Sequence, residues 1–219
     1  LSCDNVSAFG GILTSNQAID IKVAEEINKL FFEVLIAPNF SESALDLLKS
    51  KKNRIIIKLK AYPKNKLQTR SCLNGILEQD IDDKIEKFDD FKVVTKISPN
   101  STKSDDLVLA SIIVKHTKSN CIAIVKNKQL IGSGMGQVSR IDALNQAIEK
   151  SKKFGFDPNE SCLASDAFFP FSDCVEISHA NNINSIVQPG GSIKDQDSID
   201  FCNKNGMSMV FSGIRHFRH

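Results

Sequence analysis

Apolar and polar positions in the first quarter of the chain follow the periods of helices and strands in turn. A helical pattern over residues 23–30 runs into an apolar segment at 32–37, which a proline ends and which predicts a buried strand. Ser41 is a candidate N-cap for a short helix over 44–48, and a β-branched strand follows at 55–57. Alternation of this kind is typical of an α/β fold.

The second half of the chain continues this alternation. The apolar segment 107–114 predicts a buried helix with acidic residues 105–106 at its positive end, and Ser139 is the candidate N-cap of a helix that runs to about residue 153. The other predicted elements are strands over 121–125, 129–131, 167–169, 185–187 and 208–211, and helices over 174–180 and 195–203. We expect parallel neighbours among the late strands.

Two stretches interrupt the pattern. Residues 60–70 are polar and contain a proline, and residues 81–91 mix charges with few apolar positions. We interpret both stretches as linkers and exposed surface.

The overall composition narrows the class of protein. Apolar residues make up 41% of the chain and charged residues 25%, as in ordinary globular domains, and 28 basic against 26 acidic residues leave a net charge of +2. This balance lacks the basic excess that binding to duplex nucleic acid requires, and no apolar stretch approaches the roughly 20 residues that span a bilayer. We therefore expect a cytoplasmic protein with neither a nucleic-acid nor a membrane partner.

The start of the chain and its cysteines give two further expectations. The chain begins without a methionine and without a signal-peptide pattern, and we expect it to be a fragment of a longer protein. The six cysteines form no C-x-x-C pair, which argues against a zinc ribbon and a thioredoxin-type redox site. We expect reduced and mostly buried thiols.

Two glycine-containing loops are candidates for anion binding. Residues 132–140 join a predicted strand to a capped helix, where free backbone N–H groups favour a phosphate or carboxylate, and residues 189–192 repeat this arrangement. Tight structural turns explain the same glycines equally well. The first loop departs from G-x-G-x-x-G at Gln137, which argues against a dinucleotide-dependent oxidoreductase.

Three other segments have both a structural and a functional interpretation. The aromatic run 167–171 lies between Asp166 and Asp173, and it suits either a core strand with a turn or a wall for a flat heterocycle. The Lys115-His116 dipeptide suits either catalysis or the negative end of a helix dipole. The basic segment 215–219 follows a predicted strand so closely that we do not expect a frayed tail.

Six motifs occur along the chain in a distinctive order and spacing. They are S-A-F-G-G at 7–11, F-E-V-L-I-A-P at 32–38, K-H-T-K-S-N at 115–120, S-D-A-F-F-P-F at 165–171, Q-P-G-G-S at 188–192 and R-H-F-R-H at 215–219. Together they resemble the part of the bifunctional purine-biosynthesis enzymes that formylates aminoimidazole carboxamide ribonucleotide (AICAR). The resemblance covers nearly the whole chain.

This resemblance implies a fold and an activity. The expected fold is a duplicated, cytidine-deaminase-like lobe of three α/β/α layers, with the end of the first lobe plus a linker in residues 1–72 and the second lobe in 73–219. The implied reaction transfers a formyl group from 10-formyltetrahydrofolate to the 5-amino group of AICAR, in a homodimer that shares its active site. Zinc is not expected, since the chain has neither H-x-E nor P-C-x-x-C.

The resemblance also implies roles for particular residues. Contacts to the nucleotide are expected from Gly10, Glu33, Asn120, Arg140, Phe168 and Arg215. Contacts to the folate are expected from Ile141, Pro170, Phe171, Asp173, Ser192 and Ile193. A potassium ion is expected near Val114, Thr117, Ser119 and Asp166. Asn120 is also expected to support catalysis through a hydrogen bond.

The resemblance places the main catalytic pair outside the chain. In the family, a Lys-His pair in a K-H-x-x-P-x-G motif precedes the S-A-F-G-G segment, so it falls before residue 1, and Lys115-His116 resembles its counterpart in the duplicated lobe. Formyl transfer to an aromatic amine needs a base for the amine proton, and an amide such as Asn120 cannot serve as one. We therefore expect negligible turnover from this chain alone. The alternative is a non-catalytic module that binds nucleotide or folate, or that serves dimerisation.

Overall fold

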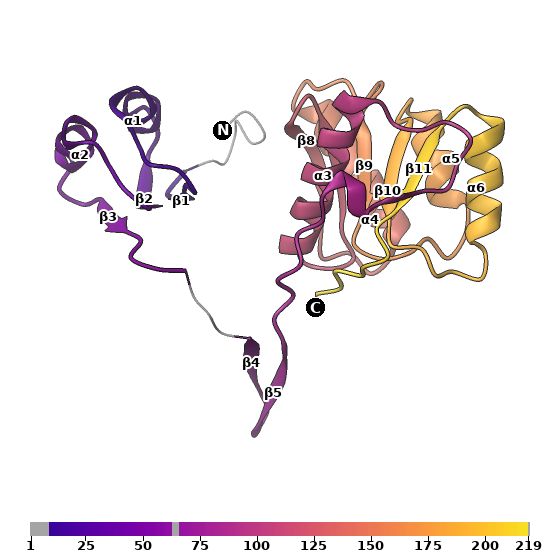
Figure 1. Ribbon diagram of the computed structural model, residues 1–219, viewed down its shortest axis with the longest axis horizontal. Helices are drawn as coiled ribbons and strands as arrows, with labels where there is room; N and C mark the ends of the chain where they lie inside the picture. The colour runs from indigo at the N-terminus through magenta and orange to yellow at the C-terminus, as the bar shows by residue number, and fades with distance from the viewer. Residues whose placement is uncertain (1–8, 63–65, 219) are drawn as a thin grey trace. The chain divides into compact units, whose positions relative to one another are not determined.

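The computed structural model describes residues 9–62 and 66–218, and it divides the chain into two compact units, Leu1–Ile81 and Asp82–His219. Each unit combines helices with β-strands (Figure 1), which confirms the predicted α/β class. The domain boundary expected at residue 72 falls on the last residue of a strand in the first unit and stays a prediction about the family's lobes.

The first unit contains a parallel sheet of three strands in the order β1-β2-β3. Its strands are β1 (Gly11–Thr14), β2 (Phe32–Ala37) and β3 (Ile55–Lys58), and the connecting helices are α1 (Ile21–Asn28) and α2 (Glu42–Lys49). The predicted N-cap is confirmed, because the Ser41 hydroxyl accepts a hydrogen bond from the Ala44 N–H at 3.2 Å. Both helices lie on one face of the sheet (Figure 1), where Ala24, Leu35 and Leu48 form the core.

A two-stranded hairpin completes the first unit. Its antiparallel strands are β4 (Leu67–Cys72) and β5 (Gly75–Asp80), and every residue of both strands is exposed. The interpretation of residues 60–70 as linker and exposed surface is therefore confirmed for the exposure of Leu67–Arg70, but a linker is wrong from Leu67 onward, where β4 begins. Polar residues such as Gln68 and Thr69 fit an exposed ribbon, and backbone pairing defines the strand without a buried apolar face.

The second unit contains a six-stranded sheet in the order β6-β11-β10-β9-β7-β8. Its strands are β6 (Lys92–Val93), β7 (Ile122–Lys126), β8 (Gln129–Gly134), β9 (Cys162–Ser165), β10 (Ser185–Gln188) and β11 (Ser208–Phe211). Strands β9, β10 and β11 are mutually parallel, which confirms the expectation for the late strands, while β6, β7 and β8 pair antiparallel to their neighbours.

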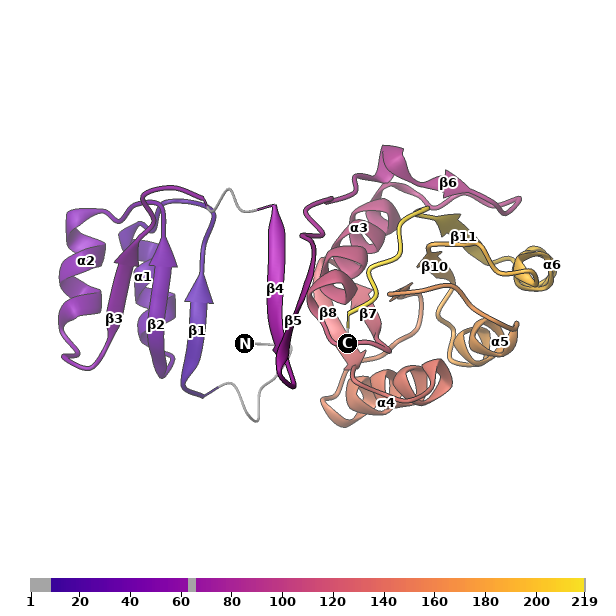
Figure 2. The ribbon, with the colours of Figure 1, turned by 90° about the horizontal axis from the view of Figure 1, so that it is seen from below.

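Helices cover both faces of this second sheet (Figure 2). They are α3 (Ser101–His116) on one face, and α4 (Arg140–Lys153), α5 (Asp173–Ala180) and α6 (Asp195–Lys204) on the other, with a short 3-10 turn η1 (Phe88–Asp90) before β6. Leu107 and Val114 of α3 pack on Ala123 and Val187, and Leu144 of α4 packs with the strand residues of the opposite face. The unit is thus a three-layer α/β/α structure. No helix within 9–62 or 66–218 is both long and apolar enough to cross a membrane.

Three expectations in the second unit need correction. The strand expected at 167–169 is wrong, because the strand is β9 at Cys162–Ser165 and the aromatic run forms the loop after it. Residues 81–91 are not all surface, since Glu86 and Phe91 are buried. Residues 105–106 do not lie at the start of α3, which begins one turn earlier with Asn100 as its N-cap.

Asp106 has another structural role in the second unit. Its two carboxylate oxygens accept hydrogen bonds from the N–H groups of Asn127 at 2.9 Å and Lys128 at 2.6 Å. These two residues form the turn between β7 and β8 and have φ angles of 54° and 61°, in the left-handed region. The buried carboxylate therefore fixes a turn that carries strain in two non-glycine residues.

Candidate functional site at the carboxyl edge of the second sheet

The predicted site residues of the second unit come from segments that meet at one edge of its sheet. The parallel strands β9, β10 and β11 end there, and the antiparallel strand β7 begins there. The segments at this edge are therefore 166–173 after β9, 189–192 after β10, 212–218 after β11 and 119–120 before β7. Ligands of open α/β sheets bind at the carboxyl ends of such strands.

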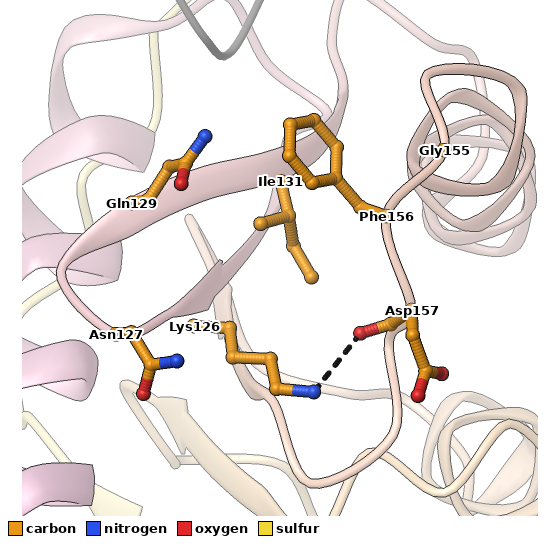
Figure 3. A pocket seen from close by; sticks show the side chains of 7 residues that line it. All are labelled: Lys126, Asn127, Gln129, Ile131, Gly155, Phe156 and Asp157. Carbon is orange, nitrogen blue, oxygen red and sulfur yellow. Dashed lines mark hydrogen bonds between the residues drawn. The ribbon is translucent and has the colours of Figure 1, made fainter.

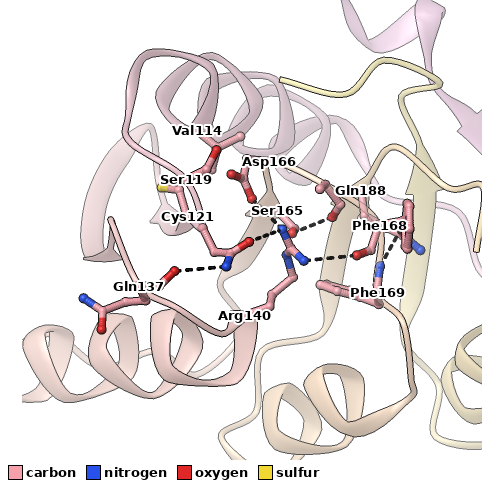
Figure 4. Close-up of polar contacts among 12 residues, drawn as sticks. Val114, Ser119, Cys121, Gln137, Arg140, Ser165, Asp166, Phe168, Phe169 and Gln188 are labelled. Atoms are coloured by element: carbon pink, nitrogen blue, oxygen red, sulfur yellow. Dashed lines mark hydrogen bonds and ion pairs between the residues drawn. The ribbon is translucent and has the colours of Figure 1, made fainter. Parts of the chain in front are cut away.

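Arg140 is at the centre of the polar contacts at this edge (Figure 4). It is the first residue of α4, and its Nη2 donates to the Asn120 Oδ1 at 2.9 Å and to the Asp166 Oδ1 at 3.0 Å. Its Nη1 donates to the Phe168 carbonyl oxygen at 3.4 Å. Four residues expected near the ligand or the cation, 140, 120, 166 and 168, are thus in direct contact.

Two polar atoms of this cluster are buried without a partner among the described residues. They are the Nε of Arg140 and the Oδ2 of Asp166, whose side chain is 0% exposed. A buried carboxylate oxygen and a guanidinium N–H both cost free energy when they lack a partner. The cluster therefore has unused hydrogen-bonding capacity on both its anion and its cation.

The Asn120 side chain is largely committed to the protein. Its amide group donates to the carbonyl oxygens of Gln137 and Val138, both at 3.0 Å, and its Oδ1 accepts from Arg140. Only a second lone pair on Oδ1 is left for a ligand. The Lys115 ammonium is also committed, because it donates to the Lys84 carbonyl oxygen and lies 3.5 Å from the Asp82 carboxylate.

The C-terminal segment is held against this cluster. The His216 N–H donates to the Asp166 carbonyl oxygen at 3.1 Å, and Ser119 and Arg218 exchange two hydrogen bonds of 2.7 Å. The Arg215 guanidinium lies 4.1 Å from the centroid of the Phe217 ring and 6.0 Å from that of the Phe168 ring. The segment through 218 is thus ordered against the sheet edge, which confirms that it is not a frayed tail; residue 219 lies outside the described residues.

His216 occupies a buried charged cluster behind this segment. Its Nδ1 lies 2.6 Å from the Asp82 Oδ2 and its Nε2 lies 2.8 Å from the Glu86 Oε1. Burial alone lowers the pKa of His216, but the hydrogen bonds to Glu86 and Asp82 outweigh it and raise the pKa above its usual range. The neighbouring His116 has a lowered pKa because of burial and the charges of Lys115 and Arg218.

The residues expected on the folate side form the outer part of the edge. Asp173 begins α5 and accepts from the Cys174 N–H at 2.7 Å, while the exposed Phe171 ring lies 4.7 Å from the Lys194 Nζ. Ser192 and Ile193 are in the loop after β10, and Ile193 is fully exposed. The remaining two expected residues are Ile141, which packs against the core, and Pro170, which is exposed in the loop after β9.

The two glycine loops are explained by internal packing and hydrogen bonding. A Cβ at Gly132 or Gly134 would collide with the backbone carbonyl oxygens of Ala147 and Ala143, so these glycines allow α4 to approach β8 closely. In the second loop, Gly190 and Gly191 have φ angles of 74° and 99°, in the left-handed region that favours glycine, and a Cβ at Gly190 would lie 2.6 Å from the Phe211 ring. For both loops the structural interpretation accounts for the glycines.

Gln188 is the first residue of the Q-P-G-G-S motif, and it contributes to the site although the sequence analysis assigned no role to its side chain. It is fully buried at the end of β10, and its Oε1 accepts from the Phe169 N–H at 3.3 Å and from the Gly190 N–H at 3.1 Å. Gln188 therefore connects the aromatic loop to the glycine loop. Sequence reasoning also missed Asp82 and Glu86, because isolated acidic residues in a polar stretch carry no pattern.

Several oxygen atoms lie where the potassium ion was expected. The unpaired Oδ2 of Asp166 is a hard donor that suits a monovalent cation. The Thr117 hydroxyl donates back to the carbonyl oxygens of Ile113 at 2.8 Å and Val114 at 3.1 Å, and the Ser119 hydroxyl accepts from Arg218. The Asp166 Oδ2 therefore fits a potassium ion, while the Thr117 and Ser119 hydroxyl oxygens already take part in hydrogen bonds. Within the described ranges, no three His, Cys, Asp or Glu side chains gather as a metal cluster.

The two expected nucleotide contacts in the first unit, Gly10 and Glu33, are near each other. A Cβ at Gly10 would lie 3.5 Å from the Glu33 carboxylate, and the Gly10 N–H donates to the Phe31 carbonyl oxygen at 3.1 Å. Glu33 and Phe31 line a pocket of about 470 Å³ whose rim includes Lys51 and Lys52. The first unit thus has a pocket of its own beside these residues.

A second, smaller pocket of about 200 Å³ lies at the other end of β7 (Figure 3). Ile131 and Phe156 form its apolar side, and the Lys126 ammonium donates to the Asp157 carbonyl oxygen at 3.3 Å. None of the expected site residues lines this pocket. It is therefore separate from the edge cluster.

The cysteines fit the expectation of reduced, mostly buried thiols. Cys121, Cys162, Cys174 and Cys202 are buried and free, and Cys72 is exposed, while Cys3 lies outside the described residues. Burial raises the pKa of Cys121 to about 11 and those of the other three buried thiols to about 12. These four thiols are protonated and unreactive near neutral pH.

The fold and the edge cluster define the class: an α/β protein whose polar and aromatic side chains gather where the parallel strands of a covered sheet end. A family model described as AICARFT/IMPCHase bienzyme matches residues 1–150 of the 219, and the chain belongs to this family.

Curated relatives agree with this assignment. Proteins named "Bifunctional purine biosynthesis protein PurH" are 54% identical in Bacteroides thetaiotaomicron, over 100% of this chain and 43% of that protein, and 49% identical in Acetivibrio thermocellus, over 99% and 42%. The one from Aquifex aeolicus is 44% identical over 99% of this chain and 42% of that protein. The chain thus spans less than half the length of the curated relatives it matches.

One solved structure has a weak likeness to the chain. It is a diaminohydroxyphosphoribosylaminopyrimidine deaminase/5-amino-6-(5-phosphoribosylamino)uracil reductase from Thermotoga maritima, with a TM-score of 0.33, 16% identity, and coverage of 51% of this chain and 35% of that one. A likeness at this level carries no argument about the fold, and the cytidine-deaminase-like lobe stays a prediction.

Proposed function

We propose that this chain is part of an AICAR formyltransferase, which transfers a formyl group from 10-formyltetrahydrofolate to the 5-amino group of AICAR in the synthesis of inosine monophosphate. The observation that carries the proposal is the contact of Arg140 with Asn120, Asp166 and the Phe168 carbonyl at the carboxyl edge of the sheet. Family membership supports the same reading. In this proposal the working protein is a homodimer with a shared site.

The nucleotide is proposed to bind between the arginines and the aromatic ring of the edge. Arg215 is exposed, and its guanidinium suits a phosphate, while the neighbouring Phe168 ring suits the flat face of an imidazole. Arg140 is held rigidly by its three acceptors, and its unpaired Nε can donate to a carboxamide oxygen. Roles in nucleotide binding are also proposed for Glu33 and Gly10 of the first unit.

The folate is proposed to bind at the outer part of the edge. Phe171 and Ile193 are exposed apolar side chains that can enclose a flat ring, and the Asp173 carboxylate can accept from the pterin N–H groups. Pro170, Ser192 and Ile141 complete this proposed surface. A potassium ion bound at the Asp166 Oδ2 would neutralise a buried carboxylate oxygen beside the nucleotide.

The chain's own residues are proposed to bind and orient the substrates, and not to remove the amine proton. The Lys115 ammonium is committed to Asp82 and to the Lys84 carbonyl, so it is not available as a catalytic group. The Asn120 amide has no basic atom, although its Oδ1 can accept a hydrogen bond from the amine. The same observations favour the second candidate, a module that binds nucleotide or folate without catalysis.

The experiment is a formyl-transfer assay with AICAR and 10-formyltetrahydrofolate, run on the 219-residue chain and on the chain extended upstream through a K-H-x-x-P-x-G motif. The proposal predicts transfer by the extended protein and negligible transfer by the chain alone. Transfer by the chain alone would move catalysis to Lys115, His116 and Asn120. Transfer by neither protein would favour the binding module.

A further inference from the structure

The buried His216 ring has two carboxylate partners among the described residues. Its Nδ1 and Nε2 lie 2.6 Å and 2.8 Å from oxygens of Asp82 and Glu86, and the residue is 4% exposed. Ionised carboxylate oxygens only accept hydrogen bonds, so this geometry suits a ring whose two nitrogens both donate. These contacts connect the last segment of the chain with a segment 130 to 134 residues earlier.

The backbone around His216 is attached to the edge cluster on the other side. The His216 N–H donates to the carbonyl oxygen of Asp166. Two residues further along the chain, Arg218 exchanges two hydrogen bonds with Ser119. Asp166 and Ser119 belong to the segments that form the candidate site. The C-terminal segment is therefore fixed both by its backbone and by one side chain.

Side chains of this segment alternate between exposed and buried, so neighbouring side chains point in opposite directions. Arg215 and Phe217 are exposed while His216 between them is buried, as in an extended chain whose successive side chains alternate. The Arg215 guanidinium then lies over the Phe217 ring and 6.0 Å from the Phe168 ring. Anchoring of the central residue determines where both flanking side chains can reach.

We propose that His216 is a positioning residue for the nucleotide site: its ring, held between Asp82 and Glu86, keeps the guanidinium of Arg215 beside Phe168, where it meets the anionic group of the nucleotide. This inference rests on the proposed function. It adds a role for three residues, 82, 86 and 216, that do not themselves contact the ligand.

The test is a double-mutant cycle on the equilibrium binding of AICAR to the 219-residue chain, measured by calorimetry. Arg215→Ala and His216→Gln are each expected to weaken binding about tenfold, as for the loss of one charge-assisted hydrogen bond. In the Arg215→Ala background, His216→Gln is expected to have less than about a twofold further effect, because it acts through the arginine. If the factors by which the two substitutions weaken AICAR binding multiply in the double variant, the proposal is overturned.

A pair of conservative substitutions at exposed positions tests the proposal without the risk that the variant fails to fold. Asp82→Asn removes one charged partner of His216 at a side chain that is 40% exposed, and Asp83→Asn is its matched control, because the Asp83 side chain is exposed and makes no hydrogen bond or ion pair among the described residues. Asp82→Asn is expected to weaken AICAR binding severalfold, and Asp83→Asn to leave it unchanged. Equal effects of the two variants would contradict the proposal.

A measurement without ligand separates this inference from the proposed function. Trypsin cleavage after Arg215, followed by the mass of the shortened chain, reports how firmly the segment is held. Cleavage is expected to be about fivefold or more faster in Asp82→Asn than in Asp83→Asn, on the same hydrogen-bond argument. Equal rates would overturn the anchoring by His216, whereas a failure of the unaltered chain to bind AICAR, with anchoring intact, would overturn the proposed function.

Discussion

The three-stranded sheet of the first unit and the six-stranded sheet of the second unit both contain apolar strands, but they differ in how many of their faces are covered. Helices cover both faces of the second sheet, and its central strands β7, β9 and β10 are almost entirely buried. Helices cover only one face of the first sheet, and within residues 9–62 its other face exposes the β-branched side chains of Ile12, Ile55 and Ile57.

This difference shows that a continuous apolar strand does not by itself reveal whether both faces of its sheet are covered. Parallel sheets normally have both faces buried, and strands such as 32–37 and 55–57 have the composition of that environment. The sequence pattern therefore predicts burial on two sides for both sheets. In the first sheet only one of those sides is filled by the described residues, and its outer face is an apolar surface without a cover.

The largest expected effect concerns a buried strand residue of the second sheet. Ile124→Ala, at a side chain that is 0% exposed, is expected to destabilise the second unit by about 2–5 kcal/mol through lost burial and a residual cavity. Ile57→Ala, at a side chain that is 42% exposed in the first sheet, is expected to cost less than about 1 kcal/mol. Hydrogen exchange read by mass spectrometry measures each unit separately, and similar costs in both sheets would remove the contrast.

A second comparison concerns the distance between helix and sheet. Gly134→Ala places a methyl group against the backbone of Ala143 in α4, and it is expected to cost about 1–3 kcal/mol through overpacking. Gly11→Ala is the matched control in the first sheet, where the nearest atom would be 4.0 Å away, and it is expected to be nearly neutral. Chemical unfolding followed by circular dichroism checks both, and a neutral Gly134→Ala would contradict the close packing of α4.

The turn between β7 and β8 should respond to the loss of its buried carboxylate. Asp106→Ala leaves the N–H groups of Asn127 and Lys128 without their acceptor. The loss of these hydrogen bonds is expected to lower the free energy of unfolding by about 1–2 kcal/mol. Asp105→Ala is the control, because Asp105 makes only an exposed ion pair with Lys128. Thermal unfolding of the two variants should therefore differ clearly, with the lower midpoint for Asp106→Ala.

The smallest effect concerns the pH dependence of the second unit. The pKa of His216 is raised in the folded state, so its stabilising contribution is fully present below the usual histidine pKa and is lost as the pH rises through the raised value. The stability difference between the unaltered chain and His216→Gln should shrink with increasing pH in that window. Unfolding measured at a series of pH values checks this, and a difference that grows with pH would show the opposite sign of coupling.

Local signals in the sequence predicted much of this fold. The N-caps Ser41 and Ser139 accept hydrogen bonds at the starts of α2 and α4, and the strands predicted over 32–37 and 208–211 have the bounds of β2 and β11. These elements are specified by residues within a few positions of one another. Pattern reasoning works where capping, burial and β-branching agree.

Long-range pairing explains what the sequence pattern missed. β9 consists of the small residues Cys162–Ser165, which fit between two covered faces, while the more apolar run at 167–169 forms a loop held by Gln188. The family resemblance implied roles for Asn120, Arg140 and Phe168, and the structure brings these three together. No local pattern could indicate His216 with Asp82 and Glu86, because their association depends on contacts across more than a hundred residues.

Titration of the 219-residue chain with AICAR tests the central claim most directly, provided that the chain first shows cooperative unfolding. The account predicts saturable binding at a single site, weakened about tenfold or more by Arg215→Ala through the loss of a charged contact. A chain that is folded but shows no saturable binding, or that binds equally well after Arg215→Ala, would contradict it.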